Sequence, residues 1–162
     1  MKRLFLALVL SFASFSVAHA QESTTDYTAS NAVIRQAPSS VGSAYVELKN
    51  TTEKSDRLIG ANADWVNKIE LHEIKTTDNG IMQMSPVDFM PLPAKGTLTL
   101  KQGGLHLMLF GIKEKLKDDE QKNMTLKFQS GKFVTVPFIV QPIGNVQKMM
   151  HDKMIMDHDH HM

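Results

Sequence analysis

The chain contains no cysteine among its 162 residues. This excludes thiolate nucleophiles, iron–sulfur clusters and thiolate zinc sites. It also excludes a blue-copper electron-transfer site, which requires a cysteine ligand. Because no disulfide can form, a hydrophobic core has to hold the fold together, and the chain is long enough for one domain with such a core.

Long apolar runs are absent except at the N-terminus. Residues 1–20 combine a basic start, an apolar run and the small-residue motif Ala18-His19-Ala20. This pattern predicts a secretory signal peptide that is cleaved after Ala20, and so a periplasmic protein. No later stretch approaches the roughly 18 apolar residues of a membrane span. Gln21 stands where a lipid-anchored protein would have cysteine.

The chain also lacks an excess of basic charge. It has 18 Lys and Arg against 17 Asp and Glu, and two of the basic residues, Lys2 and Arg3, belong to the expected signal peptide. The mature chain is therefore nearly neutral. This argues against a nucleic-acid partner, which would require a basic face.

Short β-branched or alternating segments separated by turns predict an all-β protein. Such spacing with little helical periodicity is typical of an antiparallel β-sandwich or barrel of seven to nine strands. Asp78-Asn79-Gly80 predicts a hairpin turn, and Pro86, Pro91 and Pro93 argue against a central strand in their section. The expected strands cover residues 31–35, 43–48, 57–61, 68–73, 81–84, 97–100, 105–110, 124–128 and 133–140.

Composition divides the mature chain into three parts. Residues 21–30 are small and polar and predict a flexible leader, residues 31–143 form the domain, and residues 144–162 form a tail that we expect to be disordered. The tail could bind metal, with thioethers suited to Cu(I) and imidazoles with carboxylates suited to Cu(II). Its candidate ligands are Met149, Met150, His151, Met154, Met156, His158, His160, His161 and Met162.

Only two histidines fall inside the domain, and both have methionines near them. His106 and Met108 lie two residues apart in an expected strand, so their side chains share a face. Met82 and Met84 do the same after the turn, and His72 lies on the strand before it. Imidazole and thioether ligands favour Cu(I). Taken singly, Met82 and Met84 could instead fill gaps in the core, and His72 could be a surface residue.

The spacing of this set resembles the copper motif of the PCuAC-type periplasmic copper chaperones, a His, about ten residues, a Met, 21 residues and His-x-Met. Here 21 residues separate Met84 from His106, and 11 separate His72 from Met84. The longer first interval spans the expected turn, where an insertion is tolerated best. If Met82 is taken as the ligand instead, the interval to His106 no longer has 21 residues. Met84 is therefore the favoured ligand, and Met82 remains the alternative. Further similarity lies in Ile69-Glu70-Leu71-His72-Glu73, Met84-Ser85-Pro86-Val87 and Gly103-Gly104-Leu105-His106-Leu107-Met108.

The resemblance implies a cupredoxin-like β-sandwich with a solvent-accessible Cu(I) site made by His72, Met84, His106 and Met108. It also implies delivery of copper to a respiratory oxidase centre, such as the CuA site, or to its assembly factors. We expect a monomer without enzymatic activity, since no general base or nucleophile stands out. Two alternatives stay open at this point, a periplasmic copper storage or resistance protein without a dedicated acceptor and a structural β-sandwich without metal.

Overall fold

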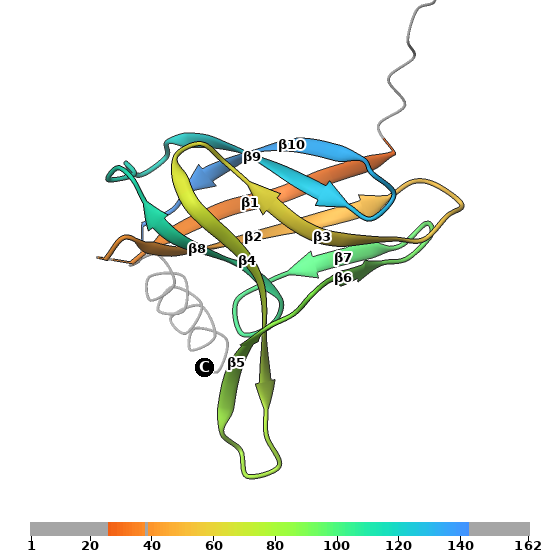
Figure 1. The fold of residues 1–162 in the computed structure, drawn as a ribbon, viewed down its shortest axis with the longest axis horizontal. Helices are drawn as coiled ribbons and strands as arrows, with labels where there is room; N and C mark the ends of the chain where they lie inside the picture. Colours follow the sequence, from red (N-terminus) through yellow and green to blue (C-terminus); the bar gives the residue numbers. More distant parts are fainter. Residues whose placement is uncertain (1–25, 38, 143–162) are drawn as a thin grey trace, which may run out of the picture.

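The computed structural model describes residues 26–37 and 39–142, and all of their regular structure is β (Figure 1). No helix in this part of the chain is long and apolar enough to cross a membrane. The expected signal peptide and the Met/His-rich tail lie outside the described residues. The strands are β1 Tyr27–Gln36, β2 Val41–Asn50, β3 Asp56–Asn62, β4 Val66–Thr76, β5 Met82–Pro86, β6 Met90–Leu92, β7 Thr97–Leu100, β8 His106–Ile112, β9 Gln121–Phe128 and β10 Phe133–Val140.

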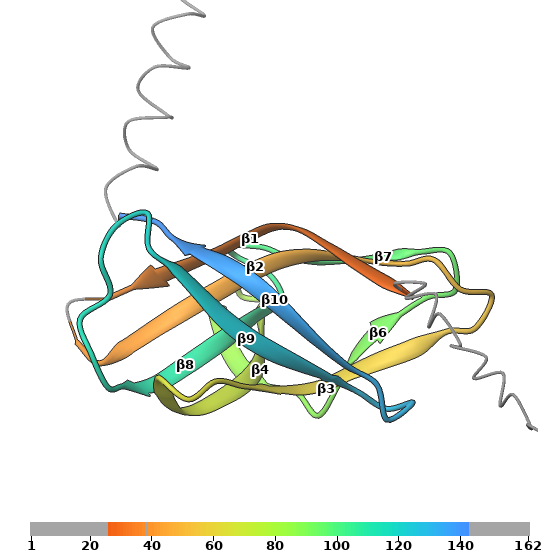
Figure 2. The same ribbon diagram turned by 90° about the horizontal axis from the view of Figure 1, so that it is seen from above.

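The strands are joined in the order β5-β4-β8-β2-β1-β10-β9-β3-β6, with β7 paired to β2. They fold into a flattened sandwich in which β1 connects the two layers (Figure 2). All pairs are antiparallel except β1 with β10, which meet in parallel at two residue pairs. The prediction of an all-β sandwich is confirmed. The predicted strand number was one too low, because the three-residue strand β6 around Pro91 has no alternating pattern to reveal it.

Proline positions agree with the sheet order. Pro86 ends β5 and Pro91 lies in β6, and these are the two terminal strands of the order. A proline has no backbone N–H to donate, so it is tolerated at a sheet edge. The expectation that this section avoids central strands is therefore confirmed.

Alternating side chains of the strands fill the core between the layers. In β2, Ala44, Val46 and Leu48 are buried, whereas the residues between them are half-buried on the outer face. In β8, Leu107 and Leu109 are fully buried in the same way. This period of two assigns every second residue of β4 and β8 to the outside of the sandwich.

The N-terminal strand begins earlier than the sequence indicates. Tyr27 starts β1, is 4% exposed and stacks on Phe128 with ring centres 4.4 Å apart. The expectation of a flexible leader over residues 21–30 is therefore wrong for residues 27–30. The reason is tertiary, because a polar segment without periodicity is ordered by pairing with β2 and by one buried aromatic ring.

Four hydrogen bonds converge on Asp56 and fix the start of β1 to β3 and to the β9–β10 turn. The donors are the Tyr27 hydroxyl at 2.5 Å, the Ser130 hydroxyl at 2.5 Å and the amides of Ser130 and Arg57 at 3.1 and 2.7 Å. Burial alone would raise the pKa of Asp56. The hydrogen bonds from Ser130, Tyr27 and Arg57 outweigh burial and hold this pKa below its ordinary value of 3.8.

Replacing Asp56 with asparagine is expected to lower the free energy of unfolding by about 2 kcal/mol at neutral pH, because charged hydrogen bonds are lost. The folded pKa lies below the unfolded one, so the stabilisation is complete above the unfolded pKa and disappears as pH falls through the folded pKa. Urea unfolding of both proteins, at pH 7 and at a pH below the ordinary aspartate pKa of 3.8, measures the difference in their free energies of unfolding. The deficit of Asp56→Asn should shrink in acid, and Asp88→Asn, at an exposed carboxylate, should show none. A deficit that stays constant with pH would contradict the assignment.

A long hairpin of β4 and β5 projects from the sandwich (Figure 1). Its turn spans Thr77 to Ile81 and is closed by a hydrogen bond from the Thr77 amide to the Ile81 carbonyl at 2.8 Å. Gly80 adopts a φ of 77°, a conformation that glycine reaches without strain. The predicted turn at Asp78-Asn79-Gly80 is confirmed.

Candidate metal centre

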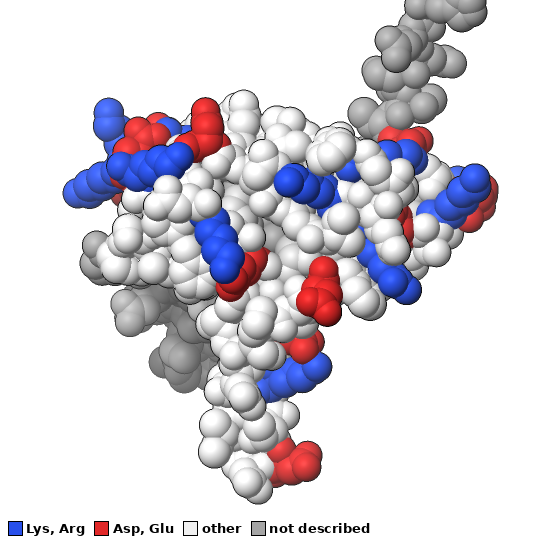
Figure 3. Space-filling model, in the orientation of Figure 1, with Lys and Arg blue, Asp and Glu red and all other residues white. Residues whose placement is uncertain are grey.

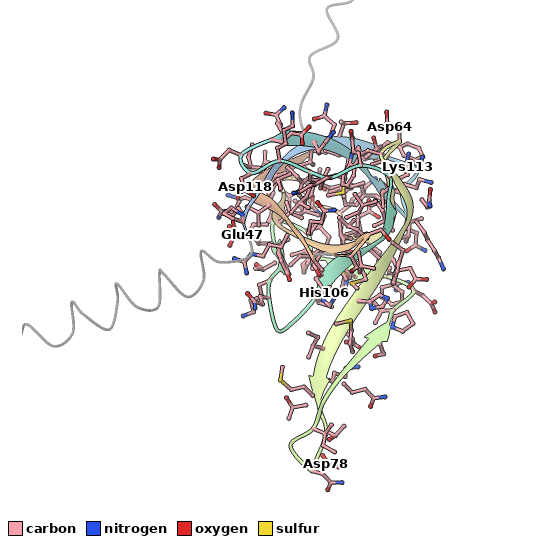
Figure 4. All side chains as sticks on the ribbon, turned by 90° about the vertical axis from the view of Figure 1, so that its left-hand side faces the viewer. Glu47, Asp64, Asp78, His106, Lys113 and Asp118 are labelled. Carbon is pink, nitrogen blue, oxygen red and sulfur yellow. The ribbon has the colours of Figure 1, made fainter. Side chains whose placement is uncertain are left out.

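The candidate residues lie on the outer face of the layer formed by β5, β4, β8 and β2. His72 of β4 pairs directly with His106 of β8, so both imidazoles emerge on the same face. Met108 follows His106 by two residues and is on that face as well. Figure 4 places His106 where the β4–β5 hairpin leaves the sandwich, with Asp78 at the hairpin tip.

The two imidazoles face each other in a largely buried setting. Their ring centres are 5.8 Å apart, and His72 and His106 are only 8% and 2% exposed. Tyr45 flanks His106 at 6.3 Å and Phe110 flanks His72 at 6.1 Å, both measured between ring centres. Aromatic groups thus border the pair on two sides.

Each histidine has one nitrogen held by a neighbour. His106 Nδ1 lies 3.0 Å from the Gly104 carbonyl oxygen, which can only accept, so Nδ1 carries the proton and Nε2 keeps a lone pair. His72 Nε2 lies 2.9 Å from a carboxylate oxygen of Glu70. His72 Nδ1 is buried and has no hydrogen-bond partner within the described ranges. A buried polar atom without a partner is uncommon.

Glu70 lies two residues before His72 on the same face and pairs with Met108. Lys68 contacts its second carboxylate oxygen at 2.5 Å. The hydrogen bonds from Lys68 and then from His72 hold the pKa of Glu70 below its ordinary range. The carboxylate is therefore charged at neutral pH, next to one of the two imidazoles.

Met108 is half-buried between Glu70 of β4 and Ser43 of β2. The Ser43 hydroxyl donates to the Met108 sulfur at 3.9 Å. The thioether of Met108 is therefore held beside the imidazole pair rather than buried in the core.

Met82 and Met84 both lie on the site face but at different distances from the histidines. Pro86 of β5 pairs with His72, Met84 pairs with Ile74 and Met82 with Thr76. At about 3.3 Å per residue, Met84 is about 7 Å and Met82 about 13 Å along the strand from the pair of His72 with Pro86. Met84 is 48% exposed and Met82 64%. Met84 is the nearer of the two.

Five of the predicted residues thus lie on one face, with Met82 the farthest along the strand from the histidines. They are His72, Met82, Met84, His106 and Met108. The candidate ligands of the tail lie outside the described residues. Within residues 26–37 and 39–142, no group of three His, Cys, Asp or Glu side chains could hold a metal ion. Sequence reasoning missed Glu70 and Ser43, although Glu70-x-His72 has the same period-two signal as His106-x-Met108.

Residues 27–140 match the family described as "Putative lipoprotein LpqE-like". The chain belongs to the LpqE-like family. One curated relative of this LpqE-like chain is "Putative lipoprotein Lxx21020" from Leifsonia xyli subsp. xyli (strain CTCB07), which is 30% identical over 102 residues, 63% of this chain and 61% of the relative. The LpqE-like chain spans less than two thirds of the length of the curated relatives it matches.

Solved structures connect the LpqE-like chain with PCuAC domains. The solution structure of CuI-DR1885 from Deinococcus radiodurans is 34% identical, covers 76% of this chain and 83% of its own, and superimposes with a TM-score of 0.55. The copper-bound PCuAC domain from PmoF2 is 21% identical, covers 72% and 93%, and has a TM-score of 0.61. The resemblance to the PCuAC family and its cupredoxin-like fold is confirmed.

Proposed function

We propose that this chain binds one Cu(I) ion through His72, Met84, His106 and Met108 and delivers it to an acceptor protein outside the cytoplasm. The observation that carries the proposal is the register of β4 with β8, which sets two imidazoles opposite each other on a face shared with two thioethers. The 34% identical relative was solved with Cu(I), which supports the same ion here.

The donor set fits Cu(I) chemically. Thioethers and neutral imidazoles are soft or intermediate ligands, whereas magnesium, calcium and manganese prefer oxygen. Metal–imidazole bonds are about 2.0 Å long, so two rings that share one ion have centres roughly 5–6 Å apart. The observed 5.8 Å separation of the His72 and His106 rings agrees with this. His72 Nδ1, which has no hydrogen-bond partner among residues 26–37 and 39–142, supplies a lone pair for the ion.

Delivery requires a side of the site that a partner can reach. The resemblance to the PCuAC family implied a solvent-accessible site. Because both imidazoles are buried, we propose that the site is accessible only from the side of Met84, which is 48% exposed. Met84 lies on β5, a terminal strand of the sheet, in a hairpin with mostly uncharged surface in Figure 3. An acceptor would approach there and displace Met84 first. We infer a CuA-type oxidase centre or its assembly factor as acceptor, and a binding protein rather than an enzyme.

A transfer assay tests delivery against storage. Protein loaded with one equivalent of Cu(I) is mixed with a metal-free CuA-type domain, and copper in each is measured after separation. Transfer within minutes supports a chaperone. The acceptor domain is chosen to have the higher affinity for Cu(I). Copper that nevertheless stays on this protein would indicate storage.

Met84 is expected to be a ligand and Met82 a neighbour. Replacing Met84 with leucine should weaken Cu(I) binding about tenfold or more, because leucine keeps the volume and loses the sulfur. Met82→Leu is the matched control, an exposed methionine on the same face two residues further out. Competition with a Cu(I) chelator measures both affinities. A larger loss for Met82→Leu than for Met84→Leu would reverse the assignment.

The tail over residues 144–162 is proposed as a second, weaker copper-binding segment on the basis of its composition. The chain beginning at Gln21 should then bind more than one copper, and deletion of the tail should reduce the number to one. Metal analysis after gel filtration measures the ratio. Equal ratios for the two proteins would eliminate the tail as a binding segment.

A further inference from the structure

The carboxylate of Glu70 is fixed between two neighbours on β4. One oxygen contacts the Lys68 ammonium at 2.5 Å and the other lies 2.9 Å from His72 Nε2. Lys68, Glu70 and His72 alternate along the strand, so all three side chains share the face of the candidate site. Glu70 is therefore held in place before any metal binds.

An ionised carboxylate can only accept a hydrogen bond. His72 Nε2 must consequently carry the proton in the contact with Glu70, and in a neutral imidazole this leaves the lone pair on Nδ1. That nitrogen is one of two buried side-chain atoms without a hydrogen-bond partner within the described residues, the other being Arg35 Nε. The ring thus presents its metal-binding nitrogen where no protein group competes for it.

His106 is fixed in the opposite way. The Gly104 carbonyl accepts from its Nδ1 at 3.0 Å, which leaves the lone pair on Nε2. The paired histidines therefore have different tautomers, one set by a charged side chain and one by a backbone carbonyl.

We propose that Glu70 is a positioning residue that holds His72 as the Nε2–H tautomer, so that His72 binds Cu(I) through Nδ1 while His106 binds through Nε2. The inference rests on the proposed function for its metal, but its statement about the tautomers holds for the metal-free protein as well. A carboxylate that accepts from the second nitrogen of a metal-binding histidine orients the ring and raises its basicity.

The chain offers a matched control in Glu73. It lies on the same strand, pairs with Lys75 at 2.5 Å as Glu70 pairs with Lys68, and points to the opposite face. Glu73→Gln removes the same charge without touching the site. Glu70→Gln leaves an amide that can donate as well as accept, so it no longer selects one tautomer.

The test is long-range ¹H–¹⁵N correlation NMR of the full mature chain, which reports the protonated nitrogen of each imidazole. In metal-free protein we expect Nε2–H for His72 and Nδ1–H for His106. Glu70→Gln should give a mixture at His72 only, and Glu73→Gln should leave both unchanged. A His72 ring protonated at Nδ1, or one unchanged by Glu70→Gln, would overturn the role of Glu70.

Addition of one equivalent of Cu(I) separates this inference from the proposed function. We expect the ¹⁵N shifts of His72 Nδ1 and His106 Nε2 to change most, and Glu70→Gln to weaken Cu(I) binding about tenfold. Binding through His72 Nε2 would overturn the inference and leave the copper site intact. Cu(I) that shifts neither imidazole would overturn the proposed function, while the tautomers of the metal-free protein still test Glu70.

Discussion

Replacing His106 with glutamine is expected to weaken Cu(I) binding by more than about 100-fold, since loss of a ligand should cost more than loss of an outer contact. His106 is 2% exposed and faces His72. Glutamine preserves a donor for the Gly104 carbonyl but provides no imidazole nitrogen. Chelator competition at neutral pH measures the affinity, with the tail-deleted chain used to isolate the domain.

Two further variants make this result specific. His72→Gln should give a loss of similar size, because both rings belong to one site. Met90→Leu should leave the Cu(I) affinity unchanged, since Met90 is fully buried in the core and away from the site face. Circular dichroism of each variant checks that the sandwich is intact. Binding by His106→Gln within threefold of the original would show that copper binds elsewhere.

Replacing Phe138 with alanine is expected to lower the free energy of unfolding by about 3–5 kcal/mol, through lost burial and the cavity left behind. Phe138 is fully buried in β10, the strand that pairs with both β1 and β9. No disulfide compensates for the loss in a chain without cysteine. At about 4 °C per kcal/mol, the melting temperature should fall by roughly 12–20 °C.

Phe133→Ala is the matched control on the same strand. Phe133 is 65% exposed, so its removal should change the free energy of unfolding by less than about 1 kcal/mol. Urea unfolding of both variants in the metal-free state keeps copper binding out of the comparison. Equal losses for the two variants would mean that the core does not determine the stability of this domain.

Most strands could be predicted from alternation. The prediction failed where a segment is ordered by distant contacts or is too short to show a period. Residues 27–30 are polar and belong to β1 only because Tyr27 is buried against Phe128 and bound to Asp56. Met90–Leu92 is too short and too rich in proline to have a period. The parallel contact of β1 with β10 joins segments about 100 residues apart, and no local signal encodes it.

The four candidate ligands were predicted from strand periodicity together with the resemblance of their spacing to the PCuAC motif. His106-x-Met108 indicates a shared face from the sequence alone, and the turn at Gly80 returns the chain along β4, so that Met84 pairs with Ile74 on the face of His72. The pairing of β4 with β8, which opposes the two imidazoles, joins distant segments and required the structure. So did the burial of the histidines and the hydroxyl of Ser43 that holds Met108.

X-ray absorption at the copper edge tests the central claim most directly. The mature chain and its tail-deleted form are loaded with one equivalent of Cu(I), and the scatterers around copper are counted. We expect two nitrogen and two sulfur ligands in both proteins, with one nitrogen fewer after His106→Gln. A copper shell without sulfur, or one that loses its sulfur when the tail is removed, would contradict the assignment of the site to His72, Met84, His106 and Met108.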